Sequence, residues 1–113
     1  MNDCIFCKIA AGQMNVPALY EDEEVFAFQD IAPVAPVHIL IVPKRHIGSA
    51  HELTDADAAL LGKLFAAARK VAGELGVAQS GYRLVTNIGP DGGQSVGHLH
   101  LHLIGGRKLL WEH

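Results

Sequence analysis

The sequence predicts an α+β fold: an antiparallel five-stranded sheet with one long helix and one short N-terminal helix, in a single domain over residues 1–113. Segments with the pattern of strands outnumber helical segments and do not alternate regularly with them, which favours an antiparallel sheet. The chain has 113 residues, of which 50% are hydrophobic and 19% charged, a length and composition that suit one globular domain.

The first half of the chain is predicted to contain a short helix and three strands. Residues 4–11 have the pattern of one or two helical turns, which Gly12 ends. Strands are expected at residues 16–20, 25–28 and 38–42. The last of these is a continuous apolar run, typical of a central strand that is buried on both faces.

The second half is predicted to contain the long helix and two more strands. Thr54 and Asp57 have the spacing of a capping box, and Gly76 is a natural stop. Between them, apolar residues recur at helical spacing: Leu60, Leu61, Leu64, Phe65, Ala68, Val71, Ala72 and Leu75. The remaining strands are expected at residues 82–86 and 98–104.

Histidine and leucine alternate without a break in the last predicted strand. Alternate residues of a strand share one face, so we expect the leucines in the core and His98, His100 and His102 together on the other face. Three interpretations fit such a row. It is a polar sheet face, a zinc site with an open water position, or a centre for nucleophilic and acid–base chemistry on phosphate.

The loop that precedes the histidines favours the phosphate interpretation. Residues 87–95 contain several glycines, which let backbone N–H groups approach a phosphate, and Gln94 and Ser95 add side-chain donors. Glycine-rich loops are common in turns, but one that leads into alternating histidines is more specific.

Charge and hydropathy narrow the class of partner. The net charge of −3 argues against a nucleic-acid binder, whereas the local basic pairs at 44–45 and 107–108 suit a small anionic ligand or are ordinary surface charges. No apolar run is long enough to span a membrane, and the first residues do not resemble a signal peptide. A cytoplasmic location is therefore expected, with no membrane partner.

Cys4 and Cys7 form a Cys-x-x-Cys pair that has three interpretations. A redox pair is disfavoured, because the βαβ context of such motifs is missing. Two buried apolar thiols, or half of a four-ligand zinc site, remain open.

Residues 92–103 resemble the signature of the histidine-triad (HIT) superfamily, in which histidines alternate with apolar residues. Residues 3–8, 28–33, 41–47 and 105–111 resemble its nucleotide-binding branch, the purine nucleoside phosphoramidases. The resemblance extends over nearly the whole chain.

This resemblance implies a homodimer whose two sheets join, and a hydrolase that cleaves the phosphorus–nitrogen bond of nucleoside phosphoramidates. His100 would be the nucleophile and would carry a nucleotidyl-histidine intermediate. His102 would hold a phosphate oxygen and help proton transfer, His98 would orient the centre, and Ser95 would contact the phosphate or the leaving group. No cofactor would be required for catalysis.

The resemblance also implies a site for a purine nucleoside monophosphate. Asp30 would accept hydrogen bonds from the ribose hydroxyls, Asn87 would contact the phosphate edge, and backbone N–H groups from Gly93 through Gln94 to Ser95 would surround it. The purine slot would consist of Phe6, Ile9, Phe28 and Ile31. Trp111 would approach the partner subunit's site. From the residues alone, Asp30 could instead cap its loop, the slot residues could be ordinary core, and the tryptophan could anchor the tail.

Some bacterial relatives bind a structural zinc ion with residues that correspond here to Cys4, Cys7, His46 and His98. Neighbouring branches of the superfamily hydrolyse dinucleoside polyphosphates or transfer nucleotides, and these reactions are alternatives. A further alternative is a non-enzymatic module that binds a nucleotide or zinc.

Overall fold

The computed structural model describes residues 3–111, and it confirms the predicted α+β fold with a five-stranded antiparallel sheet. The elements are α1 (Ile5–Ala10), β1 (Tyr20–Glu21), β2 (Val25–Gln29), β3 (Val37–Pro43), two 3₁₀ turns (Ala50–Glu52 and Asp55–Asp57), α2 (Ala58–Glu74), β4 (Tyr82–Val85) and β5 (Leu101–Gly105). The strand order is β1-β2-β3-β5-β4, and every neighbouring pair is antiparallel. β3 is therefore the central strand, as predicted.

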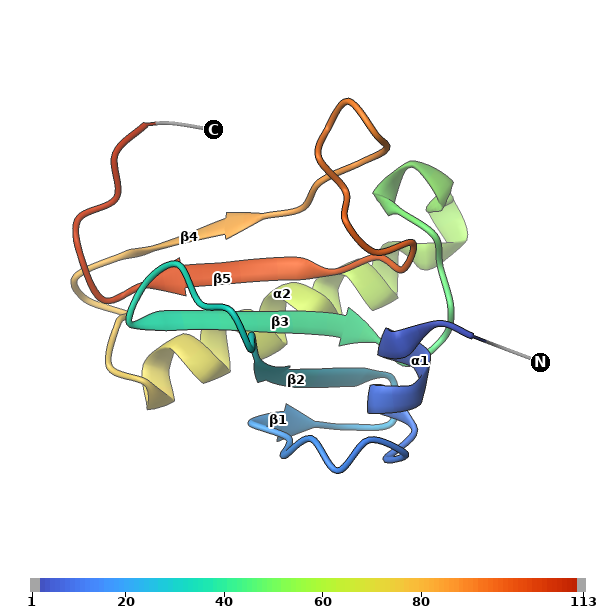
Figure 1. Cartoon of the computed structure of the whole chain (residues 1–113), viewed down its shortest axis with the longest axis horizontal. Coiled ribbons are helices and arrows are strands. Elements are labelled where there is room, and N and C mark those ends of the chain that lie inside the picture. Colours follow the sequence, from blue (N-terminus) through green and yellow to red (C-terminus); the bar gives the residue numbers. More distant parts are fainter. Residues whose placement is uncertain (1–2, 112–113) are drawn as a thin grey trace.

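The sheet separates two hydrophobic clusters, because alternate residues of each strand point to opposite faces. On one face, α2 covers a cluster that includes Ile41, Leu64 and Leu103, each at most 2% exposed. On the other face, α1 packs against Phe26 and Phe28 of β2. Figure 1 shows α2 behind the sheet and α1 in front of it, beside the end of β3.

The predicted first strand over residues 16–20 is mostly wrong, because only Tyr20 and Glu21 form β1. Pro17 has no N–H to donate to a strand ladder. Only one further ladder contact is made, between the N–H of Leu19 and the carbonyl of Ala27, at 2.8 Å.

The predicted last strand over residues 98–104 begins later than expected, at Leu101. The N–H of Leu99 donates to Ile47 instead of continuing the ladder with β3. The carbonyl of Pro43, at the end of β3, accepts a hydrogen bond from the ring of His98 at 2.9 Å. A side chain therefore satisfies this carbonyl where the strand pairing has ended.

α1 and the 3₁₀ turn that leads into α2 begin at side-chain caps. Cys4 is the N-cap of α1, and its sulfur accepts a hydrogen bond from the N–H of Cys7 at 3.4 Å. The predicted capping box of Thr54 and Asp57 is present, although it starts a 3₁₀ turn from which α2 continues at Ala58. In the part of the chain that the structure describes, no helix has the length and hydropathy needed to cross a membrane.

Candidate functional site

The three alternating histidines lie at the start of β5 beside α1. The rings of His98 and His100 are buried, at 0% and 3% exposure. Phe6 of α1 packs edge-on against both rings, with centroid distances of 6.0 Å to His98 and 5.1 Å to His100. α1 therefore closes one side of the histidine cluster.

The rings of the three histidines lie on the side away from the leucines, as the alternation predicted: His98 and His100 contact Phe6, and the ring of His102 lies 5.0 Å from that of His100. Only His102 lies within β5, because the strand begins at Leu101. His98 and His100 precede the strand, and each histidine has its own set of hydrogen-bond partners. The leucines between them do enter the core under α2, as expected.

His100 is fixed by a backbone carbonyl. Its Nδ1 lies 2.7 Å from the carbonyl oxygen of His98, and a carbonyl can only accept. Nδ1 therefore carries a ring proton, and whenever the imidazole is neutral, Nε2 has the free lone pair. The hydroxyl of Thr86 donates to the carbonyl of His100 at 2.9 Å and holds this segment against the end of β4. Such an Nε2 is suited to nucleophilic attack.

His102 contacts a fourth histidine that comes from β3. Its Nδ1 lies 2.9 Å from Nε2 of His38. Burial lowers the pKa of His102 to about 4, and the neighbouring His100 and His38 act in the same direction, whereas Asp30 opposes the shift. His102 is therefore neutral near pH 7.

The ring of His98 contacts the two cysteines of α1 and its N-cap. Its Nδ1 lies 3.3 Å from the sulfur of Cys4 and 3.5 Å from that of Cys7, and Nδ1 of His46 lies 3.2 Å from the sulfur of Cys7. Burial lowers the pKa of His98, and His46 and His100 lower it further, against the opposing effect of the Pro43 carbonyl.

The arrangement of this cluster fits a tetrahedral metal. Its four ligand atoms, from Cys4, Cys7, His46 and His98, all lie within 4.8 Å of one another. Zinc bound at about 2.3 Å to sulfur and about 2.0 Å to nitrogen needs ligand atoms about 3.5 Å apart. Because Nε2 of His98 must donate to the Pro43 carbonyl, Nδ1 keeps the lone pair that a metal ligand requires. The structure thus brings together all four predicted ligands, and the two thiols are not isolated in an apolar core.

The three-histidine metal site is not supported. Among residues 3–111, two groups have ligand atoms close enough to share a metal: the Cys–His cluster, and Asp30 with His38 and His102. His98 and His102 belong to different groups, and His100 belongs to neither.

The loop at 87–95 is held by its own side chains, which corrects the role predicted for Gln94. The amide of Gln94 accepts from the N–H of Gly89 at 3.0 Å and donates to the carbonyls of Gly48 and Val96 at 2.6 and 2.9 Å. This amide is therefore already bonded to the backbone and is not aimed at a phosphate. Its short bonds shape the loop instead.

The side chain of Asn87 and two of the backbone N–H groups predicted to contact the phosphate also form hydrogen bonds within the loop. Asn87 donates to the carbonyl of Gly92 at 2.8 Å. The N–H groups of Gly93 and Gln94 donate to the carbonyls of Pro90 and Gly89. Ser95, in contrast, is exposed and makes no side-chain hydrogen bond to the described residues, so its hydroxyl can meet a ligand.

Asp30 has a structural role in this structure. One carboxylate oxygen caps the following turn by accepting from the N–H of Ala32 at 2.8 Å. The other oxygen lies 3.4 Å from Nε2 of His38. The carboxylate is partly exposed, at 18%, and it lies beside the histidines, where a ribose could also reach it.

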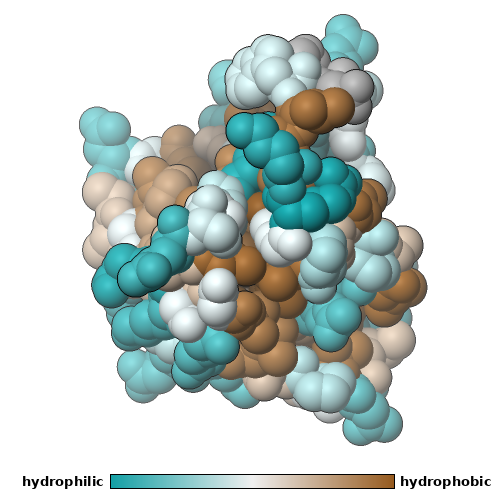
Figure 2. Space-filling model, turned by 90° about the vertical axis from the view of Figure 1, so that its left-hand side faces the viewer, coloured by the Kyte–Doolittle hydropathy of each residue, from teal (hydrophilic) through white to brown (hydrophobic). Residues whose placement is uncertain are grey.

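The residues predicted to enclose a purine are divided between core and surface. Phe6, Ile9 and Phe28 belong to the core between α1 and the sheet. Ile31 is 98% exposed and forms no closed slot with them; Trp111, predicted to approach the partner subunit's site, is 86% exposed. Figure 2 views the molecule from the side where β3 begins and the C-terminal tail lies, and hydrophobic residues are exposed there between hydrophilic ones.

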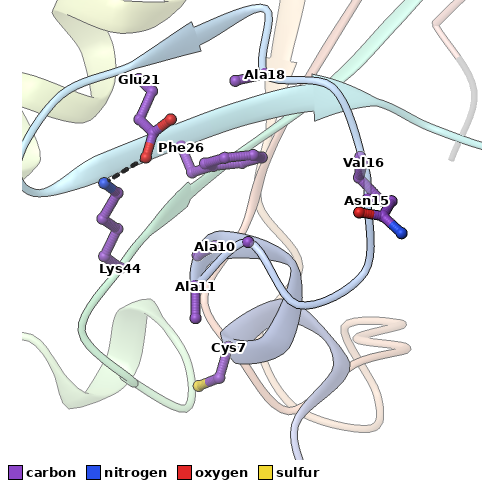
Figure 3. Close-up of a pocket in the computed structure, with 10 residues that line it drawn as sticks. Cys7, Ala10, Ala11, Asn15, Val16, Ala18, Glu21, Phe26 and Lys44 are labelled. Carbon is purple, nitrogen blue, oxygen red and sulfur yellow. Dashed lines mark hydrogen bonds and ion pairs between the residues drawn. The ribbon is translucent and has the colours of Figure 1, made fainter.

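A hollow of about 600 Å³ is lined by Cys7, Ala10 and Ala11 on the α1 side and by Phe26 of β2 (Figure 3). None of the residues predicted to bind a nucleotide lines it. An ion pair between Lys44 and Glu21, at 2.6 Å, borders it. Arg45 is likewise paired, with Asp57 at 2.5 Å, so this basic pair is neutralised rather than presented to an anion.

The sequence pattern gives His38 no role, although it is the buried partner of His102. A single histidine at the start of an apolar strand carries no motif. One signal was available in the sequence. His38 lies in an apolar strand that is expected to be buried on both faces, so its ring should be buried as well. A buried imidazole needs hydrogen-bond partners for both ring nitrogens.

Comparisons with known proteins agree with this arrangement. A family profile described as HIT domain matches residues 11–109. An uncharacterised HIT-like protein of Synechococcus elongatus is 48% identical over 96% of this chain and 95% of its own length. The crystal structure of a HIT family hydrolase from Legionella pneumophila is 46% identical, with a TM-score of 0.94 over 96% of this chain and 97% of that one. A histidine triad nucleotide-binding protein from Candida albicans is 30% identical, with a TM-score of 0.83 over 98% and 84%. The chain therefore belongs to the HIT domain family.

Proposed function

We propose that the protein is a nucleotide-binding hydrolase that cleaves the phosphorus–nitrogen bond of purine nucleoside phosphoramidates. In this reaction Nε2 of His100 attacks the α-phosphorus, the amine leaves, and water then releases the nucleoside monophosphate from a nucleotidyl-histidine. Relatives of this chain are described as a HIT family hydrolase and a histidine triad nucleotide-binding protein, which supports the class of reaction.

The observation that carries the proposal is the 2.7 Å contact between Nδ1 of His100 and the carbonyl of His98. It leaves Nε2 as a nucleophile whose orientation is fixed before substrate arrives. Phosphoryl transfer depends mainly on such positioning and on donors to the phosphate oxygens. His102, at a ring-centroid distance of 5.0 Å from His100, and the exposed hydroxyl of Ser95 would supply donors.

We further propose that Asp30 receives the ribose hydroxyls and that the purine lies between α1 and Ile31. The 98% exposure of Ile31 supports this placement, because a bound base would cover an apolar side chain that water now surrounds. Dinucleoside polyphosphates would meet the same nucleophile, so they are the alternative substrates for the assay below.

Cys4, Cys7, His46 and His98 are proposed to hold a structural zinc ion. When bound, the ion would link α1 to the segment that follows β3 and the segment that precedes β5, and no catalytic step would pass through it. Zinc-binding thiolates require reduced cysteines, which fits the cytoplasmic location predicted from the sequence.

A homodimer through β4 is also proposed. β4 is an edge strand of the sheet, and all four of its residues are only half-buried. Arg83 of β4 donates to the carbonyl of Leu110 at 3.0 Å, which brings the exposed tail alongside this edge. A second copy of β4 would pair with the backbone N–H and C=O groups of this edge and would cover apolar side chains.

Replacing His100 by alanine should abolish the release of AMP from adenosine 5′-monophosphoramidate, by about 10³-fold or more in kcat, because no other group replaces the nucleophile. AMP binding, measured by calorimetry, should persist. The exposed His51 gives the matched control: His51→Ala should hydrolyse at the wild-type rate. An unchanged rate in His100→Ala would refute the nucleophile, and no release by the wild type would favour the non-enzymatic module.

Metal analysis of the purified protein should find about one zinc ion per chain. The ion should be lost in Cys4→Ser, with a lower thermal midpoint, because α1 would no longer be tied to His46 and His98. His51→Asn, which changes an exposed histidine outside the cluster, should keep the metal. A wild type without zinc, or a Cys4→Ser variant that retains it fully, would contradict the proposed site.

The free energy of unfolding should decrease as the pH falls from about 6.5 towards 4, because His102 binds a proton in the unfolded chain below 6.5 but in the folded one only near 4. Since the ring of His102 is only half-buried, we expect its titration to account for about 1–2 kcal/mol of this decrease in the free energy of unfolding. Urea unfolding of wild type and His102→Asn between about pH 5 and 7 measures this share. Equal pH slopes for the two proteins would contradict the lowered pKa.

A further inference from the structure

Cys4 and Cys7 are the two cysteines of the chain, and the proposed hydrolysis does not use their sulfurs. Cys4 is the N-cap of α1, and the first helical turn brings Cys7 back beside it, so that the N–H of Cys7 donates to the sulfur of Cys4 at 3.4 Å. The two sulfurs lie within 4.8 Å of each other. Rotation of the side chains can therefore bring them to bonding distance, as in other Cys-x-x-Cys motifs at helix N-termini.

The Cys–His cluster is open to solvent on one side. His46 is exposed and His98 is fully buried, with the partly buried cysteines between these extremes. Of the two cysteines, both within the described residues, Cys7 alone lines the hollow of about 600 Å³ beside α1 (Figure 3). A small solute in this hollow therefore meets Cys7 rather than Cys4.

We propose that Cys4 and Cys7 are an oxidation site, at which a hydroperoxide joins the two sulfurs in a disulfide and so removes two ligands from the zinc. The proposal rests on the proposed zinc site for its metal, whereas the thiol chemistry needs the two sulfurs alone. After oxidation, His46 and His98 remain, and two ligands are too few to hold zinc in a structural site.

The oxidation proceeds in two steps. The thiolate of Cys7 attacks one oxygen of hydrogen peroxide, the O–O bond breaks, and a sulfenic acid and hydroxide form. The thiolate of Cys4 then attacks the sulfur of Cys7, the S–S bond forms, and the S–O bond breaks to release a second hydroxide. The two sulfurs together lose two electrons, which the two peroxide oxygens gain.

The sequence disfavours a redox pair because the βαβ context of thioredoxin-like motifs is missing. Oxidation by a small peroxide does not need that context. It needs two sulfurs that can meet and a path for the oxidant to one of them, and the structure supplies both. In the reducing location predicted from the sequence such a disulfide would be transient, which suits a redox-sensing role.

Loss of the metal would act on the nucleotide site through α1. Phe6 of α1 packs against the rings of His98 and His100, and Ile9 belongs to the proposed purine slot. α1 has six residues, and so short a helix depends on its contacts with the rest of the chain. Oxidation would remove the tie from α1 to His46 and His98, and nucleotide affinity should decrease.

The first test is a titration of the zinc-loaded wild type with hydrogen peroxide. We expect zinc release, followed with a chromophoric chelator, to parallel the loss of both free thiols and the appearance of an intrachain disulfide in peptide mass spectra. The affinity for AMP, measured by calorimetry, should fall at least about threefold. Dithiothreitol with added zinc should restore the metal and the affinity, and His51→Asn should behave as the wild type.

The second test is the matched pair Cys4→Ser and Cys7→Ser, each treated with peroxide in the presence of dimedone, which traps sulfenic acids. Neither variant can form the intrachain disulfide. We expect Cys4→Ser to be labelled on Cys7, and Cys7→Ser to be labelled at least about fivefold less, because Cys7 is the sulfur beside the hollow. Equal labelling of the two variants would contradict the assigned order of attack.

Thiols and zinc that persist in a large molar excess of peroxide would overturn the proposal. So would sulfinic acids without a disulfide, a disulfide between two chains, or an oxidised protein that keeps its zinc. A reversible intrachain disulfide in a protein that binds no zinc would support the oxidation site and refute the metal. None of these outcomes depends on hydrolysis of the phosphoramidate.

Discussion

A neutral imidazole carries one ring proton, and whatever bonds to one nitrogen decides what the other can do. The three triad histidines have three different partners: the carbonyl of Pro43 for His98, the carbonyl of His98 for His100, and Nε2 of His38 for His102. Under the proposed function, these partners leave one ring to bind the metal, one to act as the nucleophile and one to act as a donor. Chemically identical side chains four residues apart are thus given separate tasks by their hydrogen bonds.

The central strand β3 is the element on which these partners depend. It begins beside the loop that orients His38 and ends at Pro43, whose carbonyl holds His98. It also pairs with β5. In this register Leu40 lies opposite His102, which sets the position of His102 along the strand. The apolar residues of β3 pack on both faces, and this burial makes the geometry rigid.

The β3–β5 pairing covers only the last of the three triad histidines. His98 lies before this pairing begins at Leu101; its ring contacts Cys4, and its carbonyl accepts from Nδ1 of His100. The proposed nucleophile and the proposed zinc site therefore share His98: its carbonyl orients His100, and its ring belongs to the zinc cluster.

The sequence predicted the elements whose patterns are local and repetitive. The leucines of β5, the capping box at Thr54 and the apolar spacing of α2 led to the correct fold, and the Cys-x-x-Cys pair with its resemblance led to four residues that do meet in space. Roles that depend on a single hydrogen bond could not be predicted. Gln94 has the composition of a phosphate donor but bonds to its own loop, and the role of His38 arises only from its register opposite β5.

The covalent intermediate on His100 is the most direct test of this account. Protein mixed with adenosine 5′-monophosphoramidate would be quenched in alkaline denaturant during a single turnover, and its intact mass and peptides measured. We expect a fraction of chains to carry one adenylyl group, on the peptide that contains His100. Turnover without any adenylylated chain, or an adenylyl group on a different residue, would contradict the assignment of Nε2 of His100 as the nucleophile.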